Sequence, residues 1–212
     1  MAVQHRPVEV PEKKRMIDRA TLANRVRPKN AMIANYIEKP RTEVVQVPTP
    51  FLQRGEIDYV STRGPDPPVA YTIALAEDGF TDLLFNNIPA FYELVKHAGL
   101  RLSDDNSRLQ YVQTFLNVTT DFRTGFKILK SFDDIQLMNA AQPKEQQRYQ
   151  ELRDKYGAAI RPPVIKDSSV AQIWALQNRQ LLQIMARVSP DGRIEVAQNV
   201  LEKEVPVNYI GR

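Results

Sequence analysis

The fold of this chain is decided by residues 71–132, which read YTIALAEDGFTDLLFNNIPAFYELVKHAGLRLSDDNSRLQYVQTFLNVTTDFRTGFKILKSF. This stretch holds seven of the eight phenylalanines and three of the eight tyrosines in less than a third of the 212 residues. Aromatic side chains supply much of the apolar area that a folded core buries. We therefore expect the core to be built here, with the rest of the chain organised around it.

Helical spacing is the main pattern within this stretch. Pro89 suits the first turn of a helix and Gly99 suits its left-handed cap, which predicts a helix over residues 89–98. A second helix is predicted after Ser103–Asn106, because apolar side chains then follow at steps of three and four residues from Tyr111 to Leu129. The pattern leaves open a break near residues 118–124. Residues 71–76 form either a short strand or the lead into a short helix over residues 80–85.

The residues after this stretch predict a smaller unit. Residues 143–156 are highly charged and indicate a surface helix that ends at Gly157. Residues 170–177 show helical spacing of apolar side chains, which predicts another helix. The sequence Ser189–Pro190–Asp191–Gly192 is typical of a tight turn, and β-favouring residues flank it on both sides. We therefore expect a β-hairpin there, followed by an extended tail.

The N-terminal third has a different composition. Residues 1–70 contain nine of the fifteen prolines but only two of the eight glycines. Proline fixes φ and removes a hydrogen-bond donor, so such a segment is extended and stiff. Short helices are predicted within residues 12–26 and 31–37, the second capped by Asn30. Residues 1–41 carry ten Lys and Arg against four acids, a net charge of +6. The whole chain has a net charge of +4, so the remaining residues sum to −2.

These patterns together predict a mainly α fold, α+β overall, in three parts. Residues 1–70 are expected to be an extended, basic, proline-rich arm with short helices. Residues 71–160 are expected to be a small helical body. Residues 161–212 are expected to contain a helix, the β-hairpin and an extended tail. No apolar run is long enough to predict a transmembrane helix, and no secretory signal peptide is predicted. Residence in the cytoplasm or inside a particle is compatible with this sequence.

Catalytic and cofactor chemistry finds little support in the sequence. Cysteine is absent, which excludes disulfides and thiolate sites, and no phosphate-cradling glycine pattern occurs. The acidic pairs Asp104–Asp105 and Asp133–Asp134 lack the spacing of a calcium loop and are expected to begin helices. His97 lies in the last turn of a predicted helix, where the negative helix end favours a cationic side chain. A catalytic role would need a positioned partner such as Ser103 or Asp104, and no nucleophile motif is present. We therefore expect no enzyme, no cofactor and no metal site.

The sequence instead favours a non-enzymatic structural subunit of a large assembly, a virus or phage particle being the preferred kind. The arm would dock on neighbouring protein subunits through Phe51, Leu52, Ile57, Tyr59 and Val60. The alternative is an accessory protein that binds nucleic acid, with a basic cluster neutralising phosphates. The members of that basic cluster are Lys13, Lys14, Arg15, Arg25, Arg27 and Lys29.

Overall fold

A computed structural model of the chain describes residues 17–62, 70–121, 124–138 and 142–207. Within these residues it has five α-helices, and nine strands that form two antiparallel sheets. The helices are α1 (Arg19–Val26), α2 (Ala31–Glu38), α3 (Ile88–Ala98), α4 (Asp105–Thr119) and α5 (Pro143–Tyr156). The strands are β1 (Thr42–Val47), β2 (Gly55–Thr62), β3 (Ala70–Ala76), β4 (Thr81–Leu83), β5 (Lys127–Leu129), β6 (Val164–Lys166), β7 (Val170–Gln177), β8 (Gln180–Val188) and β9 (Ile194–Glu202).

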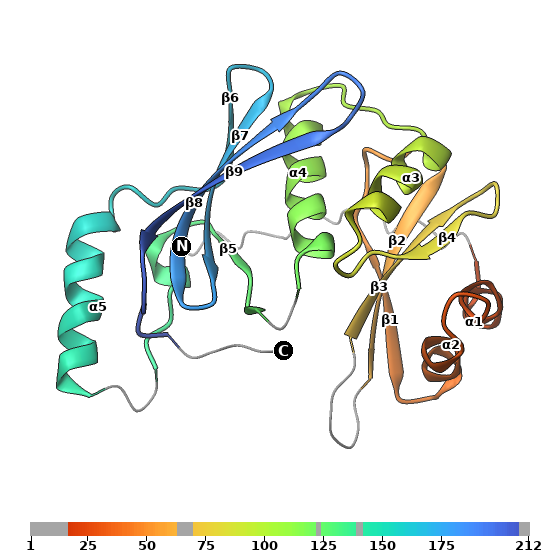
Figure 1. Cartoon of the computed structure of the whole chain (residues 1–212), viewed down its shortest axis with the longest axis horizontal. Coiled ribbons are helices and arrows are strands. Elements are labelled where there is room, and N and C mark those ends of the chain that lie inside the picture. Colours follow the sequence, from red (N-terminus) through yellow and green to blue (C-terminus); the bar gives the residue numbers. More distant parts are fainter. Residues whose placement is uncertain (1–16, 63–69, 122–123, 139–141, 208–212) are drawn as a thin grey trace, which may run out of the picture.

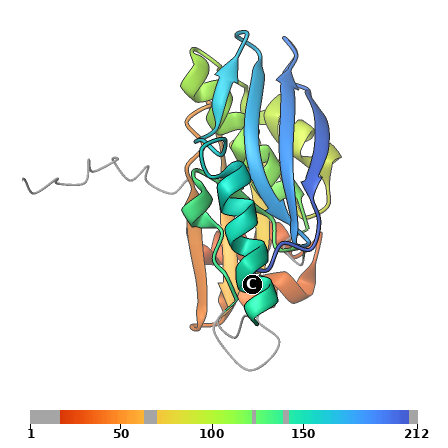
Figure 2. The same cartoon turned by 90° about the vertical axis from the view of Figure 1, so that its left-hand side faces the viewer.

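The elements form five layers, which can be followed across Figure 1 from right to left. Helices α1 and α2 cover one face of the first sheet, whose strand order is β1-β2-β3-β4. Helices α3 and α4 lie between that sheet and the second one. The second sheet has the order β5-β7-β8-β9, with β6 pairing with another part of β7. Helix α5 covers part of its outer face, as the side view in Figure 2 also shows.

The alternation of side chains along each strand divides the core among these layers. On β3, Ile73 and Leu75 pack against α1 and α2, whereas Ala74 and Ala76 face α3. The small residues let α3 approach the sheet closely. At Gly55, an added Cβ would lie 2.5 Å from the Cβ of Ala98, so only glycine fits at that contact. The sequence places its smallest side chains where the middle layer meets the first sheet.

The expected mainly α fold is wrong, because helix and strand each account for 34% of the structure. Residues 170–177, predicted to be helical, form the central strand β7. The segment 80–85, predicted to be a short helix, contributes β4. Helix α4 ends at Thr119, so the predicted helical face stops there and Leu129 belongs to β5. In each case the segment pairs with another strand, β4 with β3 across a short turn and β5 with β7 from a distant part of the chain, and the spacing of apolar residues carries no information about such pairing.

The expectation of an extended arm over residues 1–70 is also corrected for residues 17–62, whereas residues 1–16 and 63–69 lie outside the described residues. Residues 42–62 form β1 and β2, which pair with each other and with β3 to make the first sheet. Helices α1 and α2 bury Leu22, Val26, Ile33 and Ile37 against that sheet. Prolines stand between these elements, at positions 28, 40, 48 and 50, and not inside them. A proline that separates two strands marks their ends without costing a ladder hydrogen bond.

Other local predictions agree with the structure. Ser189–Gly192 connects β8 and β9 as the predicted hairpin turn. Asn30 caps α2, Pro89 lies in the first turn of α3, and Gly99 follows that helix with a positive φ of 76°. Among the residues described, none of the helices combines the length and the apolar character needed to cross a membrane.

Candidate functional site

The predicted protein-contact residues lie mostly inside the chain's own core. Phe51 and Ile57 are fully buried, and Leu52 and Val60 are buried almost as completely. Phe51 packs edge-on against Tyr111 of α4, with ring centroids 5.2 Å apart. Tyr59 is half-buried on β2. The four buried side chains are therefore not available to a neighbouring subunit, and Tyr59 alone does not make a contact surface.

The predicted nucleic-acid residues divide into two groups. Lys13, Lys14 and Arg15 lie outside the described residues. Arg25, Arg27 and Lys29 lie on or just after α1, and each binds a group of its own chain. Arg27 pairs with Glu38 at 2.6 Å, and Lys29 pairs with Asp82 at 3.3 Å. The structure does not bring these three cations together as a free basic surface.

Arg25 holds the turn between β3 and β4. Its Nη2 donates to the carbonyl oxygens of Ala76, at 2.9 Å, and Phe80, at 2.6 Å, and its Nε donates to Thr81 Oγ1 at 2.9 Å. Partial burial lowers the pKa of Arg25, and the carboxylates of Asp78 and Glu56 oppose that effect. The side chain closes a hairpin, which is a structural role that composition alone does not reveal.

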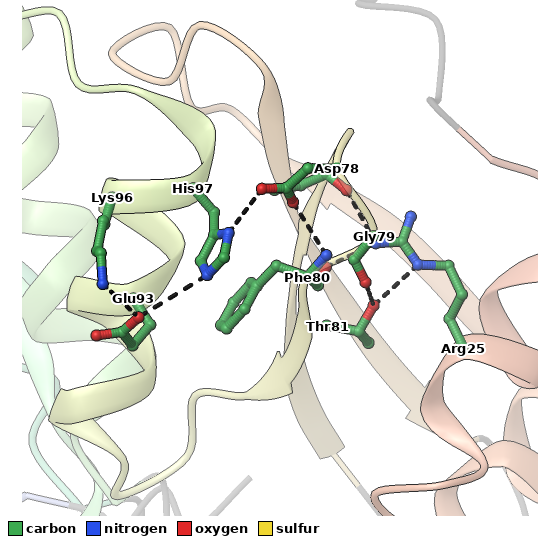
Figure 3. Close-up of polar contacts among 9 residues, drawn as sticks. Arg25, Asp78, Gly79, Phe80, Thr81, Glu93, Lys96 and His97 are labelled. Carbon is green, nitrogen blue, oxygen red and sulfur yellow. Dashed lines mark hydrogen bonds and ion pairs between the residues drawn. The ribbon is translucent and has the colours of Figure 1, made fainter.

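His97 contacts the same hairpin from the other side, at the C-terminal end of α3 (Figure 3). Its Nδ1 lies 2.6 Å from Asp78 Oδ2, and its Nε2 lies 3.8 Å from Glu93 Oε2. The Phe80 ring stacks on the imidazole, with centroids 4.7 Å apart. The hydrogen bond from His97, followed by that from the Phe80 N–H, lowers the pKa of Asp78. Asp78 is the partner that sequence spacing missed, because the β3–β4 turn brings it there from 19 residues away.

This arrangement suits a structural link better than a catalytic one. A catalytic imidazole is held by a carboxylate on one nitrogen and faces a nucleophile or substrate with the other. Both nitrogens of His97 face carboxylates. Ser103, which could have served as a catalytic partner of His97, hydrogen-bonds to Asp104 at the start of α4. In the part of the chain that the structure describes, no group of three or more His, Cys, Asp or Glu side chains is arranged to hold a metal ion.

Two hollows lie on the surface of the described residues. One, of about 630 Å³, lies between α5 and the segment after β9 and is lined by charged and amide side chains such as Arg148 and Glu151. The other, of about 690 Å³, is a shallow surface beside β1. A small-molecule pocket usually joins an apolar enclosure with a few convergent polar groups. Neither hollow has that character.

Strand β9 presents the most unusual surface of the second sheet. It forms the edge of that sheet (Figure 2). Residues 195–200 are all exposed, and successive side chains of a strand point to opposite faces. The large exposed apolar side chains of β9 are Val196, at 37% of the maximal exposure, and Val200, at 43%. Among the described residues, β8 is the only strand that pairs with β9. Within the part of the chain that the structure describes, the other side of β9 is therefore an open strand edge that can accept a further strand.

The contacts at Ile194 show which backbone groups of β9 point to this open edge. The Ile194 N–H donates to Tyr92 Oη at 3.0 Å, and the Ile194 carbonyl oxygen is 3.3 Å from the same hydroxyl. Both groups of Ile194 are therefore directed away from β8. Every second residue of a strand directs its backbone to the same side. Val196, Gln198 and Val200 consequently present their N–H and C=O groups at the open edge.

The remaining sheet edges are short or shielded. Strands β4, β5 and β6 have three residues each. Strand β1 has six, with Pro40 and Pro48 beside it, and Arg19 binds the carbonyl oxygen of its first residue, Thr42. Soluble proteins protect edges in such ways to prevent association. Strand β9 has nine residues, and its sequence from 196 to 201, VAQNVL, contains no charge and no proline.

Comparison of the chain with protein-family models, with curated proteins and with solved structures found no match. Within the described residues, the Asp78–His97–Glu93 group links α3 to the first sheet. Strand β9 is the surface best suited to a partner.

Proposed function

We propose that the protein is a non-enzymatic structural subunit of a protein assembly, and that it joins other protein chains by adding a strand to β9. The observation that carries this proposal is the long, uncharged edge of β9, with three residues directing their backbone groups outward. Strand addition gives affinity through main-chain hydrogen bonds and specificity through the side chains beside them.

The proposal keeps the functional class expected from the sequence but changes the contact surface. Four of the five residues expected to bind neighbours, all except Tyr59, are buried in the core, so β9 takes their place. Two features of the open edge support this change. Its exposed valines suit a sheet pair, and an unprotected strand of this length is a hazard to a protein that stays alone. A virus or phage particle as the kind of assembly stays a prediction.

The test uses a variant that blocks strand addition without breaking the sheet. The N–H of Gln198 points away from β8, so Gln198→Pro removes only the outward donor, and proline is tolerated at such edge positions. The native complex is recovered from cells that contain the protein, weighed by native mass spectrometry and its components identified. We expect wild-type protein in a complex of defined stoichiometry, and the Gln198→Pro variant as a single chain of 24.3 kDa.

The matched control is Gln198→Thr, which changes the same side chain but keeps the backbone donor and favours strands. It should keep the complex. Recovery of wild-type protein as a single chain, or an unchanged complex with Gln198→Pro, would contradict the proposal. A complex that contains nucleic acid, survives Gln198→Pro and is lost when Lys13, Lys14 and Arg15 become alanine would support the nucleic-acid alternative instead.

A further inference from the structure

We infer that the strand added to β9 is β9 of a second copy of this chain, paired antiparallel about a two-fold axis through Gln198. This inference rests on the proposed function, because it names the partner at the same edge. A two-fold contact uses one surface patch on both subunits, so that patch has to complement itself. The sequence of β9 can be examined for this property residue by residue.

Pairing about Gln198 matches like with like in chemical character. Val196 of one copy lies opposite Val200 of the other, and Gln198 lies opposite Gln198. All three residues direct their backbone groups to the edge, so each opposite pair exchanges two N–H···O bonds. The side chains of Val196, Gln198 and Val200 also share the inner face of the sheet, since their partners on β8 include the buried Ile184 and Leu182. The pairing thus covers the two large exposed apolar residues of β9.

The two ends of β9 limit the pairing to this central segment. At one end Tyr92 already binds both backbone groups of Ile194. At the other end, Leu181 pairs with Glu202 and Leu182 pairs with Val200, so Leu201 is an extra residue in β9 with no partner on β8. A bulge of this kind ends regular pairing on the bulged strand. The open edge therefore runs from Val196 to Val200, and Gln198 is its centre.

The charges around β9 are compatible with self-pairing. Glu195 of the two copies would lie six residues apart along the ladder, or about 20 Å, which exceeds the screening length of about 8–10 Å in physiological salt. Glu202 is already neutralised within its own chain. It accepts from Arg148 Nη2 at 2.6 Å, Lys155 Nζ at 2.7 Å and the Tyr156 hydroxyl at 2.8 Å. Within the segment that pairs, residues 196–200, this register brings no charged side chains face to face, and the like charges Arg193 and Lys203 would lie opposite each other only beyond its ends.

The test places charge on the axis itself. Gln198→Glu and Gln198→Lys each put two like charges opposite one another in a homodimer, whereas an equal mixture of the two variants puts Glu opposite Lys. Sedimentation equilibrium of the purified full chain should give wild-type species of twice 24.3 kDa. We expect each variant alone to associate at least about tenfold more weakly, because like charges in contact are costly. The mixture should associate at least as tightly as wild type.

Restoration in the mixture is specific to a two-fold contact centred at residue 198. Val164→Lys is the matched control for added charge, because Val164 is similarly exposed, at 45%, and lies on β6 at the opposite side of the sheet. It should leave the dimer intact. Three results would overturn the inference: a wild-type monomer at all concentrations, charged variants that dimerise like wild type, or a mixture that stays monomeric. A purified monomer whose cellular complex is nevertheless lost with Gln198→Pro would overturn the second copy alone and leave the proposed function standing.

Discussion

Arg25 and His97 hold the hairpin of β3 and β4 from opposite sides (Figure 3). Arg25 binds its carbonyl groups, and His97 binds the carboxylate of Asp78. Both side chains are of types that often serve a catalytic or binding function. Here their hydrogen-bonding atoms face the chain itself, so they connect α1 and α3 to the first sheet. Asp78 is half exposed, at 51%, and the contribution of its contact to stability is correspondingly modest.

The Asp78–His97 contact gives the stability of the protein a predictable dependence on pH. The pKa of Asp78 is lower in the folded chain than its ordinary value, chiefly because His97 hydrogen-bonds to it. The stabilisation is therefore present above the unfolded pKa of about 4 and is lost as the pH falls through the folded pKa. We expect the free energy of urea unfolding to fall less between about pH 5 and about pH 3 in Asp78→Asn than in wild type.

The other carboxylates with lowered pKa, such as Asp104 and Glu202, act equally in both proteins and cancel in this comparison. His97→Ala removes the main cause of the shift and should reduce the pH dependence in the same direction. Equal pH dependence in wild type and Asp78→Asn would show that the contact does not form in solution.

At the scale of elements, β9 is positioned by side chains from α3 and α4. Tyr92 of α3 binds Ile194 at the start of the strand, and Tyr111 of α4 donates to the carbonyl oxygen of Gly192 in the preceding turn at 2.5 Å. Burial raises the pKa of Tyr111, which keeps its hydroxyl protonated as a donor. These contacts fix the start of β9, while its central residues remain exposed at the edge. The helices thus orient the surface proposed for association.

Removing the Tyr92 hydroxyl should loosen the start of β9. In Tyr92→Phe the Ile194 N–H loses its partner, at a cost of about 1 kcal/mol, so we expect its hydrogen exchange to become about fivefold faster. Exchange is followed residue by residue by NMR. Tyr111→Phe is the control, because it removes a bond to a carbonyl oxygen and leaves the donor of Ile194 paired. Unchanged exchange at Ile194 in Tyr92→Phe would contradict this role.

At the scale of the whole molecule, the middle layer joins the two sheets. The core around α3 and α4 takes Ile57 and Ala74 from the first sheet, and Ile173 and Ile184 from the second. Phe91 lies in that core, with its ring 5.2 Å from Phe115 and 5.5 Å from Tyr111. A core shared in this way makes neither sheet independent of the other. We therefore expect the described layers to unfold together.

This cooperativity can be measured with the single tryptophan. Trp174 lies on β7 under α5, so its fluorescence reports on the second sheet, whereas far-UV circular dichroism reports on all elements. In urea both signals should give the same midpoint. Phe91→Ala should lower both by the same amount, at a cost of about 3–5 kcal/mol for a large core truncation. Separate midpoints would show that the sheets unfold as independent units.

The starts of α2, α3 and α4, the end of α3 and the tight turn before β9 could be predicted from the sequence, whereas the end of α4 could not. Asn30, Asp104, Pro89 and Gly99 act through hydrogen bonds and φ angles within a few residues, so their effect can be read locally. Helix α5 and the turn at Ser189–Gly192 were predictable for the same reason. The absence of charge from the centre of β9 was also visible in the sequence, but its position at a sheet edge was not.

Only the tertiary structure decided which apolar segments became strands and which side chains remained accessible. In β7, the spacing of Val170, Ile173 and Trp174 fits a helix, yet β5, β6 and β8 all pair with this segment. Ile57 and Val60 were expected to be contact residues of an arm, but in the structure β2 pairs with β3 and both side chains are buried. A strand satisfies its backbone only by pairing with other strands, some adjacent in the chain and others distant, so its existence, its burial and its open edge are properties of the assembled sheet.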